Sequence, residues 1–172
     1  CVTPLAIMAS GRAVVLDLFE YSPKNRSGLQ GEKGALSPSE QSRRIYDFLL
    51  KLFEKFPMTK SVPRMWIFES AEGGQMLRIQ FEENYGEPTC IVEKKSIWGD
   101  VKRVRNMLSE DILFFNTVGG VNTEILISDI ENYVIDENTN DIKKNQREDT
   151  IDSLEYATKL YYDRPIARGG IY

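Results

Sequence analysis

The chain has 172 residues, of which 41% are hydrophobic and 28% charged, a composition typical of one compact globular domain and not of a disordered segment. It contains no histidine, which excludes Ser-His and Cys-His triads, histidine-ligated zinc and an imidazole base, so any catalysis must use carboxylates, lysines, tyrosines or a metal. The net charge of −4 argues mildly against a nucleic-acid partner, although a local basic face can lie beside acidic groups.

The N-terminal part of the chain reads as two strands followed by a loop. Residues 2–8 and 13–21 are rich in apolar and β-branched residues, and the four residues between them suit a hairpin turn. Residues 22–37 are rich in Gly, Ser, Lys and Pro, which predicts a surface loop.

The middle of the chain predicts a helix, a strand, a helix and a strand. Ser37 is a suitable helix cap and Pro38 a suitable first helical residue, and apolar residues then recur at helical spacing until Pro57. The apolar run that follows is bounded by Pro63 and ends in Glu69, which predicts a buried strand. We expect the remaining elements of this part at residues 74–84 (helix) and 89–92 (strand).

The last part continues the alternation of helices and strands. We expect a basic helix at residues 98–108, a strand at 112–115, a helix at 122–133, an exposed hairpin or loop at 136–148 and a final helix at 149–161. Strands alternating with helices after an initial hairpin predict an α/β fold with helices on the faces of the sheet. No linker or repeat divides the chain, so residues 1–172 are predicted to form a single domain.

Acidic residues lie at two places where chemistry is expected. Glu69 ends a predicted buried strand, and ligand sites of open α/β sheets gather at the carboxyl ends of strands. Asp149 and Asp152 are three residues apart near the start of the last helix, so they share one face of it. Each also has a non-functional interpretation. Glu69 would be an acidic residue placed where the strand leaves the core and meets water, and the two aspartates would only stabilise the helix dipole.

Considered together, these carboxylates suggest a metal site. Mg²⁺ and Mn²⁺ prefer oxygen ligands, and a few carboxylates from separate elements commonly supply them. In a two-metal nuclease, ions roughly 4 Å apart activate the attacking water and stabilise the leaving oxygen. No histidine is needed for that mechanism.

Two segments of the chain resemble motifs of the nuclease domain of tailed-bacteriophage terminase large subunits, which belongs to the RNase H-like superfamily. One segment, similar to the family's second acidic motif, is Phe68-Glu69-Ser70-Ala71-Glu72. The other, similar to the family's C-terminal end, is Asp149-Thr150-Ile151-Asp152-Ser153-Leu154-Glu155-Tyr156-Ala157. The resemblance implies an RNase H-like mixed central sheet with helices on both faces. It also implies a two-metal-ion DNA endonuclease that cleaves concatemeric viral DNA during genome packaging.

The resemblance assigns roles to particular residues. It implies that Glu69 and Asp152 are catalytic metal ligands and that Asp149 is a further ligand of two Mg²⁺ or Mn²⁺ ions. The family's first metal-binding Asp lies a few residues before a Thr such as Thr3, a position that would precede Cys1 here. Asp17 could take its place, but we expect it to face the site without anchoring the metal.

Basic residues gather at two places that could contact double-stranded DNA. One is in and just before the predicted helix at residues 98–108, and the other is at residues 143–147, just before the last helix. Lys102 and Arg105 share a face of the predicted helix, where they could neutralise adjacent phosphates. The alternative is an ordinary solvated helix face. The complete set predicted to bind DNA is Lys94, Lys95, Lys102, Arg103, Arg105, Lys143 and Lys144.

The resemblance also implies the setting. It implies that the ATPase is a separate N-terminal domain, absent from this chain, and that the full motor also binds a portal protein. No apolar run approaches the roughly 20 residues of a membrane span. Cys1 and Cys90 do not make a disulfide framework, so a reducing compartment, the host cytoplasm, is expected.

Two other functions are alternatives to the terminase-like endonuclease. A different RNase H-like nuclease, of the resolvase or transposase type, is disfavoured by the final helix with its two aspartates and the following Tyr-Ala. A non-catalytic module that docks DNA or a portal protein, with an incomplete metal site, belongs to another functional class, and the missing first-strand Asp is its best support.

Overall fold

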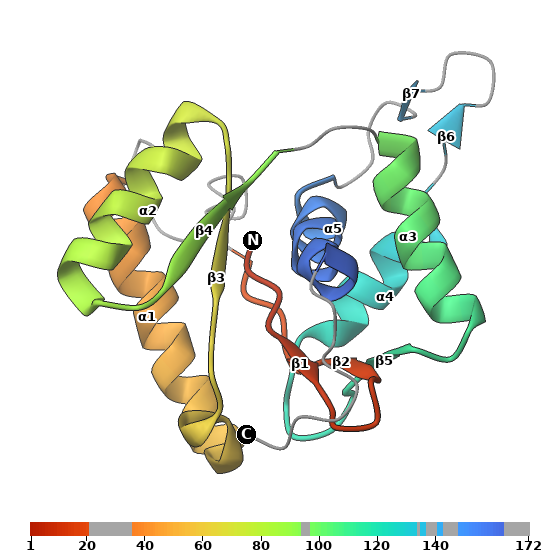
Figure 1. Cartoon of the computed structure of the whole chain (residues 1–172), viewed down its shortest axis with the longest axis horizontal. Coiled ribbons are helices and arrows are strands. Elements are labelled where there is room, and N and C mark those ends of the chain that lie inside the picture. The colour runs from red at the N-terminus through yellow and green to blue at the C-terminus, as the bar shows by residue number, and fades with distance from the viewer. Residues whose placement is uncertain (21–35, 94–96, 134, 137–140, 143–147, 164–172) are drawn as a thin grey trace, which may run out of the picture. The chain divides into compact units, whose positions relative to one another are not determined.

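The computed structural model describes residues 1–20, 36–93, 97–133, 135–136, 141–142 and 148–163 of the chain (Figure 1). They form two compact units, one of Cys1–Leu18 and Lys94–Tyr172 and the other of Phe19–Glu93. Both units combine helices with short strands, so the predicted α/β class is confirmed. The single domain over residues 1–172 stays a prediction. No helix in the described part of the chain is both long and apolar enough to cross a membrane.

Three strands form the sheet of the first unit: β1 (Leu5–Ile7), β2 (Ala13–Val15) and β5 (Leu113–Phe115), in the order β1-β2-β5. The antiparallel β1–β2 pair places Leu5 opposite Val15 and confirms the predicted hairpin, while β2 and β5 are parallel. Both hairpin strands are shorter than predicted. Leu18 is fully buried although it lies outside the sheet, so its apolar character reflects packing and not strand pairing.

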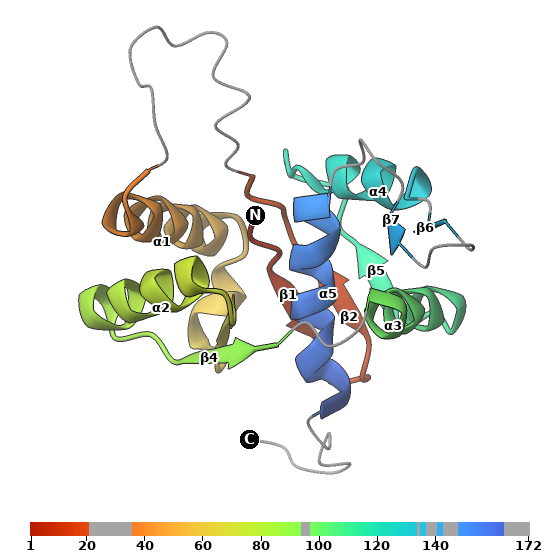
Figure 2. The same cartoon turned by 90° about the horizontal axis from the view of Figure 1, so that it is seen from above.

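Three helices complete the core of the first unit: α3 (Ile97–Ser109), α4 (Thr123–Glu131) and α5 (Glu148–Asp163). Helix α5 packs against α3, α4 and β1 (Figure 2). Its residues Ile151 and Leu154 join a core that includes Val15, Met107 and Leu126. Within the predicted charged segment, β6 (Ile135–Asp136) and β7 (Asp141–Ile142) pair antiparallel, which confirms the hairpin alternative.

In its described residues, the second unit contains two helices, a short 3-10 helix and a pair of strands: α1 (Pro38–Lys55), η2 (Pro57–Ser61), β3 (Trp66–Glu69), α2 (Glu72–Tyr85) and β4 (Thr89–Val92). Strands β3 and β4 are parallel. The core of this unit is largely aromatic: Phe81 of α2 is fully buried and its ring contacts Tyr46, Trp66, Phe68 and Tyr85.

Local signals set several helix ends. The Ser37 hydroxyl accepts a hydrogen bond from the Glu40 N–H at 3.2 Å, and Pro38 follows it, as predicted for the start of α1. Helix α2 ends at Gly86, whose φ of 64° is in the left-handed region that favours glycine. Helix α2 begins two residues before the predicted start. Its N-cap residue, Ala71, has extended backbone and makes no side-chain cap hydrogen bond, so no capping side chain in the sequence indicates this start.

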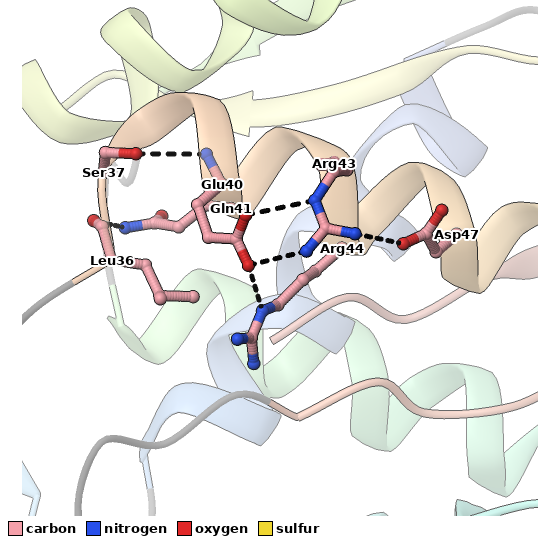
Figure 3. Close-up of polar contacts among 7 residues, drawn as sticks. All are labelled: Leu36, Ser37, Glu40, Gln41, Arg43, Arg44 and Asp47. Carbon is pink, nitrogen blue, oxygen red and sulfur yellow. Dashed lines mark hydrogen bonds and ion pairs between the residues drawn. The ribbon is translucent and has the colours of Figure 1, made fainter. Parts of the chain in front are cut away.

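The first turns of α1 carry a network of charged side chains, shown in Figure 3. Arg43 donates to both carboxylate oxygens of Glu40 and to Asp47, while Arg44 donates to Glu40 at 2.9 Å. The hydrogen bonds from Arg43, and then those from Arg44, lower the pKa of Glu40 from 4.5 to about 2. Because the network is exposed to solvent, its contribution to stability is screened by salt.

The shifted pKa of Glu40 predicts a pH dependence for the variant Glu40→Gln. A carboxyl group whose pKa is lowered in the folded state stabilises the protein fully above its unfolded value of 4.5, and this stabilisation is lost as the pH falls towards about 2. The difference in free energy of unfolding between wild type and Glu40→Gln should therefore be constant above about pH 5 and shrink below it. Urea denaturation at several pH values, at low and high salt, measures it. Glu54→Gln, also on the exposed surface of α1, is the control, and an equal pH dependence in both variants would contradict the prediction.

Candidate functional site

Glu69 is the last residue of β3 and lies at the carboxyl end of the strand, as predicted. It pairs in register with Val92 of β4, and its side chain is exposed. Ser70 and Ala71 make the turn into α2, and Gln75 of the first turn of α2 donates to the Ser70 carbonyl at 2.6 Å. The carboxylate is therefore held at the junction of a strand and a helix, both of which belong to the second unit.

Asp149 and Asp152 lie in the first turns of α5. Asp149 is exposed and Asp152 is half-buried, whereas Thr150 between them is fully buried. The Thr150 hydroxyl donates to a carboxylate oxygen of Asp129 in α4 at 2.6 Å, which ties the two helices together. The apolar face of α5 points inward, as predicted, and Asp149 is directed to solvent.

The start of the chain is attached to the same turn of α5. The hydroxyls of Thr3 and Ser153 are hydrogen-bonded at 2.5 Å, and Ser153 also donates to the Thr150 carbonyl. Thr3 is buried. The backbone that leads into β1 therefore lies beside the residue that follows Asp152.

The donor set of these carboxylates suits a hard divalent cation. Glu69, Asp149 and Asp152 supply oxygen ligands alone, which matches the preference of Mg²⁺ and Mn²⁺. Glu69 belongs to one unit and the two aspartates to the other. Within the described residues, no group of three or more Asp, Glu or Cys side chains is arranged to hold a metal ion.

Asp17 is buried and accepts hydrogen bonds from the backbone. Its side chain is 2% exposed, and its Oδ1 atom accepts hydrogen bonds from the N–H groups of Leu18 at 2.8 Å and Asn122 at 2.9 Å. The Asn122 side chain in turn donates to the Leu18 carbonyl. Asp17 thus fastens the chain after β2 to the residue that precedes α4, a role that its position in the sequence did not reveal.

The predicted DNA-binding residues fall into three groups. Lys102 and Arg105 are exposed on α3, whereas Arg103 donates to Asp100 at 2.8 Å and is partly buried. The buried Asp100 also has the Lys159 ammonium at 4.0 Å, so this charge cluster joins α3 to α5. The remaining four predicted residues lie outside the described part of the chain: Lys94, Lys95, Lys143 and Lys144.

A cavity of about 390 Å³ lies between α3, α4 and α5 in the first unit. Its lining is mostly apolar: Trp98, Val101, Val104, Arg105, Leu108, Ile130, Tyr133, Ile151, Leu154 and Glu155. Neither Asp149 nor Asp152 lines it, so the cavity is separate from the candidate carboxylate site. Trp98 is 37% exposed and contributes to this lining.

Sequence reasoning missed the buried charged residues of α5. Glu155 is 2% exposed and Lys159 is 8% exposed. A signal was present, because Glu155 lies four residues after Ile151 and next to Leu154, on the helical stripe that packs into the core. Residue type alone would favour a surface position for Glu155.

Comparison of the chain with protein-family models, with curated proteins and with solved structures gave no match. The candidate site therefore rests on its own chemistry and on the motif resemblance.

The buried position of Asp17 predicts a loss of stability in Asp17→Ala. The substitution leaves two backbone N–H groups without their acceptor, which should cost about 2 to 4 kcal/mol of the free energy of unfolding. Urea denaturation measures the loss. Asp17→Asn keeps one acceptor oxygen and should lose less. Equal stability of wild type and Asp17→Ala would refute this structural role.

Proposed function

We propose that this chain is a metal-dependent DNA endonuclease of RNase H-like fold, resembling the nuclease domain of a terminase large subunit. The observation that carries the proposal is the placement of Glu69 at the carboxyl end of β3, together with Asp149 and Asp152 on one face of α5. The three-stranded sheet β1-β2-β5 has one antiparallel and one parallel pair, and this mixed pairing supports the proposed fold.

The proposed reaction is hydrolysis of a phosphodiester bond in double-stranded DNA. Two bound Mg²⁺ or Mn²⁺ ions would activate the attacking water and stabilise the leaving oxygen. The carboxylates of Glu69 and Asp152 would supply the main oxygen ligands, and that of Asp149 a further one. The partly buried Thr150–Asp129 hydrogen bond would keep the carboxylate face of α5 in one orientation.

The contact between Thr3 and Ser153 bears on the position of Asp152. Because Thr3 is hydrogen-bonded to the residue after Asp152, the backbone that leads into β1 is fixed against this turn of α5, beside the proposed ligand. Asp17 is not proposed as a further ligand, since its Oδ1 atom accepts two backbone hydrogen bonds.

The proposed biological role is the cutting of concatemeric viral DNA during genome packaging in the host cytoplasm. The chain would act there with a terminase ATPase domain and a portal protein. The exposed cations Lys102 and Arg105 of α3 would neutralise DNA phosphates.

Cleavage of supercoiled plasmid tests the enzymatic proposal. The purified chain should nick or linearise the plasmid with Mg²⁺ or Mn²⁺ and not with EDTA. Glu69→Ala and Asp152→Ala should each lower the rate by at least about a hundredfold, because each removes a metal ligand. Glu83→Ala, which removes an exposed carboxylate of α2, is the matched control and should cut at the wild-type rate.

The same experiment distinguishes the alternative function. A folded chain that binds DNA but does not cut it with either metal would support a non-catalytic docking module. Cleavage that survives both substitutions would place the active site elsewhere.

The double variant Lys102→Gln/Arg105→Gln tests the DNA-binding surface. If each cation neutralises one phosphate, the slope of log affinity against log salt concentration should become shallower by about 2. Fluorescence anisotropy with duplex DNA over about 50 to 200 mM salt measures that slope. Lys51→Gln/Lys60→Gln removes two exposed charges from the second unit and is the control. Equal slopes in the two double variants would rule out a specific role for the α3 cations.

A further inference from the structure

Gly74, in the first turn of α2, lies directly against Glu69. A Cβ atom at position 74 would stand 2.4 Å from the Glu69 carbonyl oxygen and 2.5 Å from the Glu69 Cγ atom. The Glu69 carbonyl carbon would be 3.2 Å away. Both shorter distances are below any that real Cβ atoms make, so any side chain at position 74 requires Glu69 or the helix to move.

The neighbouring Gly73 provides an internal comparison. It is exposed, and a Cβ atom there would have no heavy atom within 4 Å. Both glycines lie in the first turn of α2 and both should carry a similar conformational cost in a helix. Gly74 differs from Gly73 because it is buried against the end of β3.

We propose that Gly74 is a positioning residue for Glu69, which rests on the proposed role of Glu69 as a metal ligand. The missing side chain leaves the space in which the Glu69 methylene group lies. The Glu69 Cγ atom therefore lies close against the backbone of Gly74, although the residue as a whole is exposed. The carboxylate is thereby directed before a cation arrives.

The physical benefit is preorganisation. An exposed glutamate has several rotamers and loses that freedom when it binds a metal. A contact that already restricts the side chain removes part of the cost, as groups around the ligands do in metal sites generally. The contact lies at the junction of β3 and α2, so both the strand and the helix restrain it.

Alanine substitutions separate this role from helix propensity. Gly73→Ala adds a methyl group in open space and should leave the chain as stable as wild type, or more so. Gly74→Ala places the same methyl group against the Glu69 backbone carbonyl, which cannot rotate away as the end of a side chain can. The end of β3 and the first turn of α2 must then separate, and Glu69 moves with the strand.

The test is the Mn²⁺ dependence of plasmid cleavage by the whole chain, measured for wild type, Gly73→Ala, Gly74→Ala and Glu69→Ala. In Gly74→Ala the half-saturating Mn²⁺ concentration should rise by about tenfold or more, the range seen when a supporting group of a metal ligand is lost. The rate at saturating Mn²⁺ should fall by a smaller factor. Gly73→Ala should match wild type, and circular dichroism should show that all four chains are folded.

The outcomes are distinct. If Gly74→Ala has the Mn²⁺ dependence of Gly73→Ala, the positioning role is wrong. If Glu69→Ala has wild-type Mn²⁺ dependence, Glu69 is not a metal ligand. That result contradicts the proposed function itself, independently of the result for Gly74→Ala.

A measurement on wild type keeps the inference testable if Gly74→Ala does not fold. Side-chain NMR couplings should show one dominant rotamer for Glu69 and averaging for Glu54, an exposed glutamate of α1. Equal averaging at the two residues would overturn the inference.

Discussion

The first unit depends on the burial of α5, the last helix of the chain. Polar side chains of this helix bond to three separate elements: Thr150 to Asp129 of α4, Ser153 to Thr3 before β1, and Tyr161 to the Gly11 carbonyl in the hairpin turn. A buried polar group without a partner is costly, so these bonds form together in only one rotation of the helix. That rotation directs Asp149 outward and packs Ile151 and Leu154 into the core.

The second unit constrains its carboxylate in another way. Glu69 is exposed, and no network of buried polar bonds surrounds it in the described contacts. Its position follows from the pairing of β3 with β4 and from the close approach of Gly74. Both candidate sets of ligands therefore lie on strands and helices and not on long loops. Helices and strands fix the positions of ligand side chains more precisely than loops do.

Much of the fold was predictable because its signals are local. The start of α1 follows from Ser37 and Pro38, and the end of α2 follows from Gly86, since each needs only the neighbouring backbone. The prediction was wrong for the extent of the first two strands and for the start of α2. Apolar residues such as Leu18 are buried by packing against distant residues, and composition cannot separate that burial from strand pairing.

By itself, the sequence determined the α/β class, the order of the elements, the absence of any imidazole chemistry and the identity of the exposed carboxylates Glu69 and Asp149. Only the tertiary structure decided that Asp17 is a structural acceptor, because its partner Asn122 is 105 residues away. It also decided that Arg103 is paired with a buried aspartate and that Gly74, not Gly73, contacts Glu69. The role of Asp17 and the burial of Asp100 depend on which segments meet in space, whereas helical and strand periodicity depend on neighbours in the chain. The difference between Gly74 and Gly73 depends on how the turn after β3 brings the first turn of α2 against the strand.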